Sequence, residues 1–222
     1  MILSHSDYER ERSFSADVVV VGTGAGGAVV GTELAESGRD VLFVEEGSWV
    51  STDAFNPYSS ESIPRLYRDA AATVILGNPP IPYVEGRCVG GSTTVNGGMA
   101  YRPPERVVAR WAKIRAGLGA RALEPLFERV EKQVSVGPQL PESIGDDNRV
   151  MTDGARKMGW SYTVNQRNQQ ACVGANNCGF GCPTGAKQST LVTYMPRALA
   201  AGARCLTELK VERLWIEAGR AV

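Results

Sequence analysis

Apolar residues gather in a few short runs, and the first of these runs opens a strand–helix–strand pattern near the N-terminus. Residues 18–21 are four consecutive valines, which predicts a strand buried on both faces. A helical stretch follows over roughly residues 25–37, and Gly38 stands where helices commonly end. A second apolar strand is predicted over residues 41–44. Together these elements predict one β-α-β unit of an α/β fold.

The next part of the chain has a different, more polar pattern. Residues 48–84 are rich in Ser, Pro and Asn and predict a long excursion over the surface, with one helical patch near 63–72. Such a segment either covers a cofactor or is an ordinary loop. Residues 105–132 predict a helix that is broken near 117–119 and at Pro125. The apolar residues at helical spacing in that stretch are expected to lie in the core: Trp111, Ile114, Leu118, Leu123, Leu126, Phe127 and Val130.

The last third of the chain continues with short elements. In chain order the pattern predicts a connector (133–150), a helix (151–160), a Cys- and Gly-rich loop (171–190), a helix (191–201), two strands (204–207 and 211–217) and a hairpin turn (217–220). The chain stops as the strand after that turn would begin, so we expect the sequence to be a fragment of a longer protein.

Composition and charge narrow the function classes. The 222 residues include 24 basic and 24 acidic residues, a formal net charge of +0, which favours neither a nucleic-acid nor a membrane-surface partner. No apolar run approaches the ~20 residues of a transmembrane helix. Residues 1–16 lack the apolar core of a signal peptide and predict a polar arm. Five cysteines, an odd number, favour a cytoplasmic protein with reduced or metal-bound thiols over a disulfide framework.

The segment between the first strand and the first helix carries candidate chemistry. Residues 22–27 satisfy G-x-G-x-x-G: Gly22 permits a tight turn, Gly24 lets a pyrophosphate approach the backbone, and Gly27 lets the helix pack close to the sheet. The helix N-terminus adds free N–H groups and a positive dipole end. Glu45 follows 18 residues after Gly27, where it can accept hydrogen bonds from both ribose hydroxyls and repel a 2′-phosphate. FAD or NAD is therefore favoured over NADP, and the alternative is a glycine-rich turn that binds nothing.

A second stretch of small residues lies at 86–104 and reads GRCVGGSTTVNGGMAYRPP. The run Gly90–Thr94, beside Val95–Gly98, lets backbone amides and hydroxyls approach a phosphate or a flat ring closely. An ordinary turn is the alternative interpretation of this stretch.

Three cysteines near residue 175 form a third candidate site. Cys172, Cys178 and Cys182 follow the spacing C-x5-C-x3-C-P. Short-loop thiolates followed by a proline commonly hold iron–sulfur clusters, whereas zinc would need a fourth ligand. Plain, mostly buried thiols are the main alternative, followed by a zinc site or a disulfide.

With both glycine-rich stretches in view, the sequence resembles the N-terminal half of a glucose–methanol–choline (GMC) oxidoreductase. The resemblance is carried by VVVVGTGAGG through VLFVEEG, by GRCVGGSTTVNGGMAYRP, which is similar to the family's first signature, and by a helix followed by LTELKVERLWI. It implies a Rossmann-like FAD-binding domain with the beginning of an inserted substrate domain. The implied parts are a polar arm (1–16), the FAD-binding domain (17–110), the inserted segment (111–185) and the returning FAD-binding domain (186–222).

The resemblance also implies a cofactor and a site. It favours FAD, bound non-covalently, over NAD, with Asn96 and Gly97 near the isoalloxazine ring and Val211 meeting the adenine through its backbone. Motif and resemblance together predict these cofactor-binding residues: Gly22, Thr23, Gly24, Ala25, Gly26, Gly27, Glu45, Gly90, Gly91, Ser92, Asn96, Gly97 and Val211. Lys187, in a stretch that resembles the return into the flavin domain, either faces phosphate or flavin or is solvated.

In this family an alcohol loses its hydroxyl proton to a base while hydride passes from its carbon to flavin N5. The small-molecule substrate is therefore expected to be an alcohol, and CPTGAKQS resembles members that oxidise long-chain alcohols and sterols. The three-cysteine spacing resembles sugar dehydrogenases with a 3Fe–4S cluster, which would pass electrons to an external acceptor.

The sequence also departs from the family pattern. The family's catalytic His lies in a C-terminal part that these residues do not include, and the single histidine, His5, is expected on the surface. The 222 residues alone are therefore expected to contain no catalytic residue and to be inactive. The alternatives are a non-catalytic FAD-binding remnant and an NAD-linked flavoprotein reductase.

Overall fold

The structure is a computed structural model that describes residues 1–7 and 11–221. Its chain divides into two compact units. The first unit comprises Met1–Asn96, Asn177–Pro183 and Ser189–Val222, and the second comprises Gly97–Asn176 and Thr184–Gln188. This division rests on packing, and the domain boundaries at residues 110 and 185 stay a prediction.

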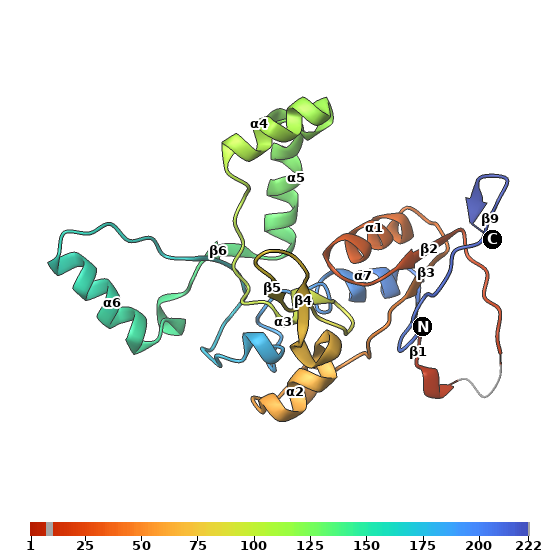
Figure 1. Cartoon of the computed structure of the whole chain (residues 1–222), viewed down its shortest axis with the longest axis horizontal. Coiled ribbons are helices and arrows are strands. Elements are labelled where there is room, and N and C mark those ends of the chain that lie inside the picture. The colour runs from red at the N-terminus through yellow and green to blue at the C-terminus, as the bar shows by residue number, and fades with distance from the viewer. Residues whose placement is uncertain (8–10, 222) are drawn as a thin grey trace. The chain divides into compact units, whose positions relative to one another are not determined.

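A four-stranded parallel sheet forms the centre of the first unit (Figure 1). Its strands are β1 (Ile2–Leu3), β8 (Arg204–Leu206), β3 (Val41–Val44) and β2 (Val18–Val21), and they lie side by side in that order. Val20 pairs with Phe43, and Phe43 pairs with Cys205 across the sheet. The two strands predicted first, β2 and β3, are confirmed with the predicted bounds.

Two helices pack on this sheet and on each other, α1 (Ala25–Glu36) and α7 (Tyr194–Ala200). A Cβ atom at Gly31 of α1 would lie 2.2 Å from the ring of Phe43, so the missing side chain lets the helix approach the sheet. Thr32 of α1 donates a hydrogen bond to the carbonyl oxygen of Tyr194 at 3.1 Å. The fully buried core lies where these elements meet and includes Ala28, Val41, Phe43, Met195, Ala198 and Cys205.

The prediction that β2 is buried on both faces is wrong. The side chains of Val19 and Val21 are 55% and 56% exposed, whereas that of Val20 is 9% exposed. The physical reason is that α1 packs on β2 and β3 from one side, so alternate side chains of the strand point away from the helix layer.

The prediction of a polar arm over residues 1–16 is wrong for its first residues, because Ile2–Leu3 form the edge strand β1. The amide of Cys205 donates to the carbonyl oxygen of Met1 at 2.9 Å, and the amide of Thr207 donates to that of Leu3 at 2.8 Å. The N-terminus therefore satisfies backbone donors that β8 would otherwise leave open at the sheet edge. His5 lies in a short 3-10 helix, η1 (His5–Asp7), and is exposed as expected.

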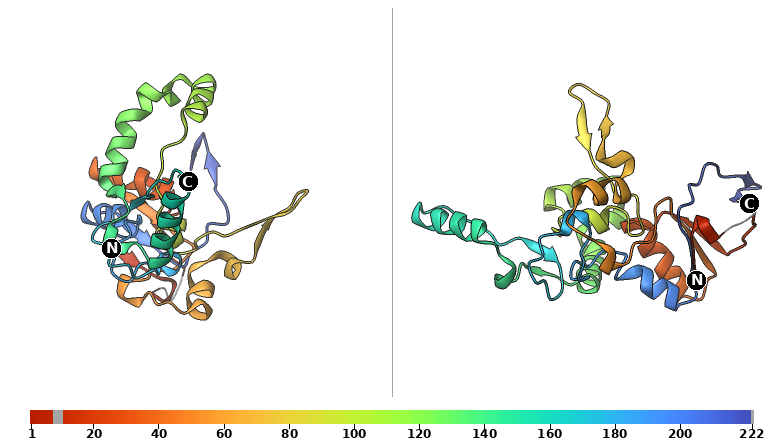
Figure 2. Two further views of the ribbon diagram at one scale, coloured as in Figure 1. Left: turned by 90° about the vertical axis from the view of Figure 1, so that its left-hand side faces the viewer. Right: turned by 90° about the horizontal axis from the view of Figure 1, so that it is seen from below.

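The excursion after β3 contains more structure than the one predicted helical patch. Its helix α2 spans Ser59–Leu66 and so begins four residues before the expected start. The hairpin of β4 (Thr73–Ile75) and β5 (Ile81–Tyr83) extends away from the rest of this unit (Figure 2). The other short elements of the unit are η2 (Thr52–Ala54), η3 (Arg68–Ala71), α3 (Ser92–Val95) and η6 (Cys178–Phe180).

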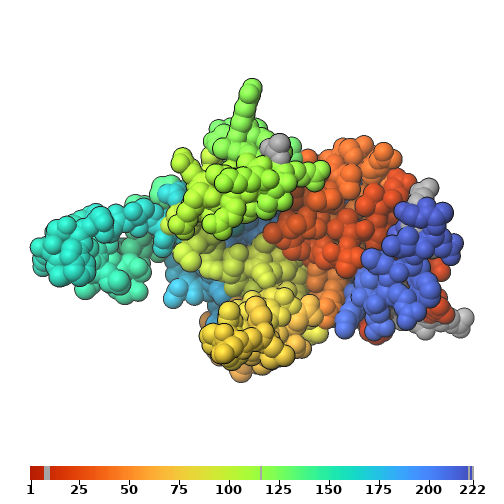
Figure 3. All heavy atoms as spheres, turned by 45° about the horizontal axis from the view of Figure 1, so that its top comes forward, coloured from red at the N-terminus to blue at the C-terminus, as the bar shows by residue number. Residues whose placement is uncertain are grey.

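The strand predicted over 211–217 is wrong except at its end, where β9 (Ile216–Glu217) forms the predicted hairpin with β10 (Arg220–Ala221). The amides of Glu208 and Leu209 donate to the carbonyl oxygens of Gly47 and Glu45 at 3.1 and 3.0 Å. The residues directly after β8 are therefore hydrogen-bonded to the end of β3. In the described part of the chain they add no strand to the four-stranded sheet. Figure 3 shows this C-terminal stretch in blue beside the red N-terminal strand–helix segment.

The second unit consists of helices and one small sheet. Its elements are α4 (Glu105–Ile114), η4 (Ala116–Leu118), α5 (Ala120–Gln133), β6 (Val136–Pro138), η5 (Pro141–Ser143), α6 (Asp146–Lys157) and β7 (Gln166–Asn168). Strands β6 and β7 pair antiparallel. The predicted break near 117–119 is confirmed, because η4 separates α4 from α5. The predicted break at Pro125 is wrong: α5 continues through this residue, since a proline removes only one backbone donor from a helix of 14 residues. The short helix predicted from residue 151 begins earlier, at Asp146.

The prediction that the apolar residues of α4 and α5 form a core is wrong. Ile114 is 77% exposed, Leu126 51% and Val130 41%, and α5 has no buried residue. The helix packs on short neighbours, α4, η4 and β6, which are too small to bury a whole apolar face. Among the residues described, no helix has the length and apolar character needed to span a bilayer.

Candidate functional site

The turn between β2 and α1 forms one wall of the candidate site. The backbone of Gly22 has φ of +89°, and its amide donates to the carbonyl oxygen of Val44 at 2.8 Å. A Cβ atom at Gly24 would meet no atom within 4 Å, whereas one at Gly27 would lie 2.1 Å from the carbonyl oxygen of Gly22. The turn therefore leaves open space above Gly24 and close packing beneath Gly27. The first N–H groups of α1, which have no partner within the helix, begin at the same point.

The second glycine-rich stretch forms the opposite wall. Gly90 has φ of +90°, and Gly91 follows it at the start of the short helix α3. A Cβ atom at Gly91 would lie 3.1 Å from Cα of Gly24, so the two glycine-rich segments approach each other at backbone distance. Ser92 accepts a hydrogen bond from the amide of Gly86 at 3.0 Å, which closes this loop on itself.

Thr23 connects the two walls from behind. Its side chain is fully buried. Its hydroxyl donates to Oε2 of Glu45 at 2.6 Å and accepts from the amide of Gly90 at 3.0 Å. The hydroxyl of Thr190 donates to the carbonyl oxygen of Thr23 at 3.0 Å. One threonine thus holds the first turn, the end of β3, the second loop and the start of the return segment together.

Glu45 stands at the end of β3, 6% exposed. Its Oε2 accepts from the amide of Thr23 at 2.9 Å as well as from the hydroxyl, and its Oε1 accepts from the amide of Gly47 at 2.9 Å. An ionised carboxylate has about four acceptor positions, so the protein itself fills three of them. The expectation that Glu45 accepts hydrogen bonds from both ribose hydroxyls does not fit this arrangement, which leaves about one position on Oε1.

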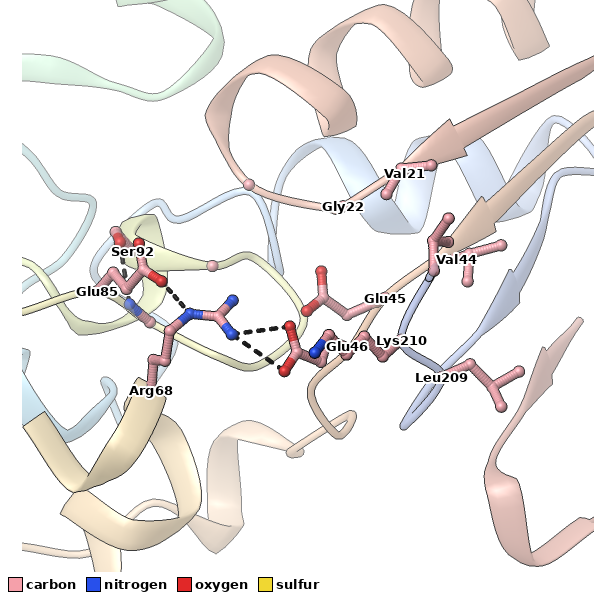
Figure 4. A pocket seen from close by; sticks show the side chains of 14 residues that line it. Val21, Gly22, Val44, Glu45, Glu46, Arg68, Glu85, Ser92, Leu209 and Lys210 are labelled. Carbon is pink, nitrogen blue, oxygen red and sulfur yellow. Dashed lines mark hydrogen bonds and ion pairs between the residues drawn. The ribbon is translucent and has the colours of Figure 1, made fainter. Parts of the chain in front are cut away.

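A pocket of about 380 Å³ lies between these walls (Figure 4). Six of the predicted cofactor-binding residues line it: Gly22, Gly24, Glu45, Gly91, Ser92 and Val211. The volume falls within the range of small-molecule sites. Every residue that lines the pocket belongs to the first unit.

The other predicted residues do not line this pocket. Thr23 and Gly90 lie behind its walls, Gly27 packs on Gly22, and Ala25 and Gly26 are exposed at the start of α1. Asn96, which follows α3, is exposed, and Gly97 is the first residue of the second unit.

The structure adds charged residues that sequence reasoning missed. Arg68 of η3 donates through Nη1 to both carboxylate oxygens of Glu46, at 2.9 and 3.0 Å, and through Nε to Glu85. These bonds, the one to Glu46 first, raise the pKa of Arg68 above its ordinary value. All three residues line the pocket, together with Leu209 and Lys210. The only sequence signal for them was the position of Glu46 next to Glu45.

The three cysteines of the predicted cluster are half-buried and form no disulfide. Cys172 belongs to the second unit, and Cys178 and Cys182 belong to the first. In the described part of the chain, no three His, Cys, Asp or Glu side chains are grouped so that they could hold a metal ion. The iron–sulfur cluster is therefore without support.

Lys187 and the two cysteines outside the predicted cluster are buried. Lys187 is 3% exposed, so the solvated alternative is wrong, and its side chain lies about 3.3 Å from the position of a Cβ atom at Gly98. Cys88 and Cys205 are at most 1% exposed. Burial, reinforced by the charge of Glu45, raises the pKa of the Cys205 thiol to about 12.

Comparison with known proteins adds to this geometry. A family model described as GMC oxidoreductase matches residues 16–222. An uncharacterized GMC-type oxidoreductase of Sinorhizobium fredii is 36% identical over 213 residues, which are 95% of this chain and 42% of the relative. A long-chain-alcohol oxidase of Arabidopsis thaliana is 29% identical over 215 residues, 95% of this chain and 28% of that protein. This chain thus spans less than half of these relatives.

A solved structure gives the same fold. The crystal structure of pyridoxine 4-oxidase from Mesorbium loti superposes with a TM-score of 0.67 at 17% identity, over 93% of this chain and 45% of that one. At this identity the match establishes the architecture of the chain, an α/β fold built on a parallel sheet.

Proposed function

The chain belongs to the GMC oxidoreductase family, and from that premise we propose that it binds FAD and serves the oxidation of an alcohol. The observation that carries the proposal is the approach of two glycine-rich segments, Gly24 against Gly91, over a pocket that ends at a buried carboxylate. This arrangement is suited to a dinucleotide, whose phosphates need bare backbone and whose ribose needs an acceptor.

The donor set fits the adenine-nucleotide half of FAD. The open space above Gly24 and the first N–H groups of α1 suit the pyrophosphate. Ser92 would approach it from the second loop, and the remaining acceptor position of Glu45 suits one ribose hydroxyl. The backbone near Val211 would meet the adenine. The proposal includes no iron–sulfur cluster.

When bound, FAD supplies the group that accepts the hydride from the carbon that carries the hydroxyl group of the alcohol. The residues of this chain would hold the nucleotide and fix its orientation. A fixed orientation lets the flavin and the substrate meet in the geometry that the reaction requires. The alcohol as substrate class is supported by the long-chain-alcohol oxidase among the relatives. His5 is exposed in the N-terminal 3-10 helix and is given no part in proton transfer.

The first test measures FAD binding by the purified chain. We expect a yellow protein that retains FAD through gel filtration and quenches its fluorescence on titration. Gly24→Val should keep the fold, because a Cβ atom there meets nothing within 4 Å, and should abolish binding, because it projects into the pocket. Gly137→Val is the matched control, since Gly137 is equally unobstructed but lies in the second unit. A wild-type chain without affinity for FAD would refute the proposal.

The second test concerns the reaction. The FAD-loaded protein is mixed anaerobically with primary alcohols of increasing chain length, and the visible absorbance of oxidised flavin is followed. Bleaching by an alcohol and not by NADH supports alcohol oxidation. Bleaching by NADH alone favours the NAD-linked reductase, and bleaching by neither favours a binding remnant.

A further inference from the structure

The pocket has one feature that neither the glycine motifs nor the family comparison assigns, the arginine Arg68. Two backbone hydrogen bonds fix its place: the amide of Arg68 donates to the carbonyl oxygen of Glu85 at 3.0 Å, and the amide of Arg87 donates to that of Leu66 at 2.7 Å. Tyr67 and Gly86 form an antiparallel bridge between these bonds. The end of α2 is thereby paired with the edge of the second glycine-rich stretch, and Arg68 is carried into the pocket lining.

Two carboxylates orient the guanidinium group, as Figure 4 shows. Nη1 donates to both oxygens of Glu46 and Nε donates to Glu85. Nη2 has no hydrogen-bond partner among residues 1–7 and 11–221. Only 34% of the Arg68 side chain is exposed, so the group is held in one place with one edge still available to a ligand.

The charges of the pocket indicate what this edge could bind. Three carboxylates line the pocket, those of Glu45, Glu46 and Glu85, against two cations, Arg68 and Lys210. A diphosphate brings further negative charge into the same space, and its binding there is favoured by a cation that lies next to it. Arginine suits the position because its planar fork binds two carboxylates and still presents N–H groups to phosphate oxygen.

We propose that Arg68 is a phosphate-binding residue of this site, one that contacts the diphosphate of the bound dinucleotide through Nη2 while Glu46 and Glu85 hold it in position. The proposal rests on the proposed dinucleotide function. It adds one phosphate-binding side chain, supplied by the excursion over residues 48–84. It also gives the excursion over residues 48–84 a role, because α2 and η3 carry the contact.

The test compares ADP with adenosine, which lacks the phosphates, by calorimetric titration of the chain and its variants. Arg68→Gln is expected to weaken ADP and FAD binding about tenfold or more, the typical effect of losing a charge-assisted hydrogen bond. Adenosine affinity should stay within about twofold. Arg197→Gln is the matched control: Arg197 forms a bidentate ion pair with Glu36 at 2.9 and 2.6 Å and does not line the pocket. It should bind both ligands as the wild type does.

A triple variant separates direct contact from simple neutralisation. In Arg68→Gln/Glu46→Gln/Glu85→Gln the two carboxylates no longer repel phosphate, so full recovery of ADP affinity would overturn a direct contact, and persistent loss supports it. Equal loss of ADP and adenosine in Arg68→Gln would show a structural role and would also overturn the proposal, as would unchanged ADP affinity. If the wild type binds neither FAD nor ADP, the proposed function fails together with this inference. If the wild type binds both FAD and ADP, the results for the Arg68 variants test the role of Arg68 independently of the proposed function.

Discussion

Two neighbouring glycines of the first turn of α1 offer a matched test of how the site is built. A Cβ atom at Gly26 would meet no atom within 4 Å. A Cβ atom at Gly27 would lie 2.1 Å from the carbonyl oxygen of Gly22, 3.0 Å from its carbonyl carbon and 3.2 Å from Cγ1 of Val20. The same chemical change, Gly to Ala, therefore has opposite consequences at adjacent positions.

The magnitudes follow from these distances. Alanine is favoured over glycine inside a helix by up to about 1 kcal/mol, so Gly26→Ala should leave stability unchanged or raise it slightly. Gly27→Ala gains the same propensity, but its Cβ lies 2.1 Å from a backbone oxygen and must move to at least 3.4 Å from it to reach ordinary contact. Overpacking of this kind costs about 1–3 kcal/mol, and a clash with backbone belongs at the upper end. The two variants should therefore differ by about 3 kcal/mol.

Thermal unfolding followed by circular dichroism measures this difference. For a chain of this size, 1 kcal/mol shifts Tm by about 2–4 °C, so Gly27→Ala should melt about 6–12 °C below Gly26→Ala. FAD affinity should fall in Gly27→Ala as well, because the helix moves away from the turn at Gly22. Equal melting temperatures for the two variants would refute the argument that α1 is pressed against this turn.

Three further predictions concern other parts of the first unit. Glu45→Gln should weaken FAD binding at least about tenfold, measured by fluorescence titration with Glu36→Gln as the control. Whichever way the amide is turned, its NH2 group faces an N–H group that the carboxylate accepted from, that of Thr23 or that of Gly47. Unchanged affinity would contradict the assignment. The pKa of Cys205, raised to about 12 by burial, predicts slow reaction with thiol reagents at pH 8 until the chain is denatured. Because the unfolded thiol ionises near 9.0, the free energy of unfolding should fall as pH rises above about 9, and less so in Cys205→Ala. Deleting residues 1–4 should lower Tm and expose the thiol of Cys205 to reagents, since β1 covers the edge of β8; unaltered labelling would count against that strand.

The local pattern predicted the β-α-β unit well. Strands β2 and β3 and the helix α1 lie where the valines, the glycines and Gly38 place them, because their bounds depend on near neighbours. Burial was predicted less well, since the exposure of Val21 and Ile114 depends on which elements cover them. Strand β1 carried no local signal at all, because two residues become a strand only through pairing with β8.

Part of the candidate site was likewise predicted from local sequence, and part of it was missed. Gly22 and Gly24 were found by sequence because glycines at this spacing, directly after a strand and before a helix, are typical of a nucleotide-binding turn. Gly91 was found in the second run of small residues, which lets a ligand approach the backbone. The structure brings these glycines to one pocket. Arg68 was missed because its partners lie 22 and 17 residues away along an irregular chain. No period or motif relates such positions, and only the backbone pairing of residues 66–68 with 85–87 brings them together.

The hydrogen bonds around Thr23 explain how distant segments form one pocket. Its buried hydroxyl joins Glu45 to the amide of Gly90, and its carbonyl oxygen accepts from Thr190. Each buried polar group in this network would cost about 1–3 kcal/mol if it lost its partner, so the network favours one arrangement of the four segments. Glu45 is oriented by three protein donors, so the remaining acceptor position, which the proposal assigns to a ribose hydroxyl, is fixed by the fold. Binding would then require little reordering of the walls, and such preorganisation raises affinity without any additional contact.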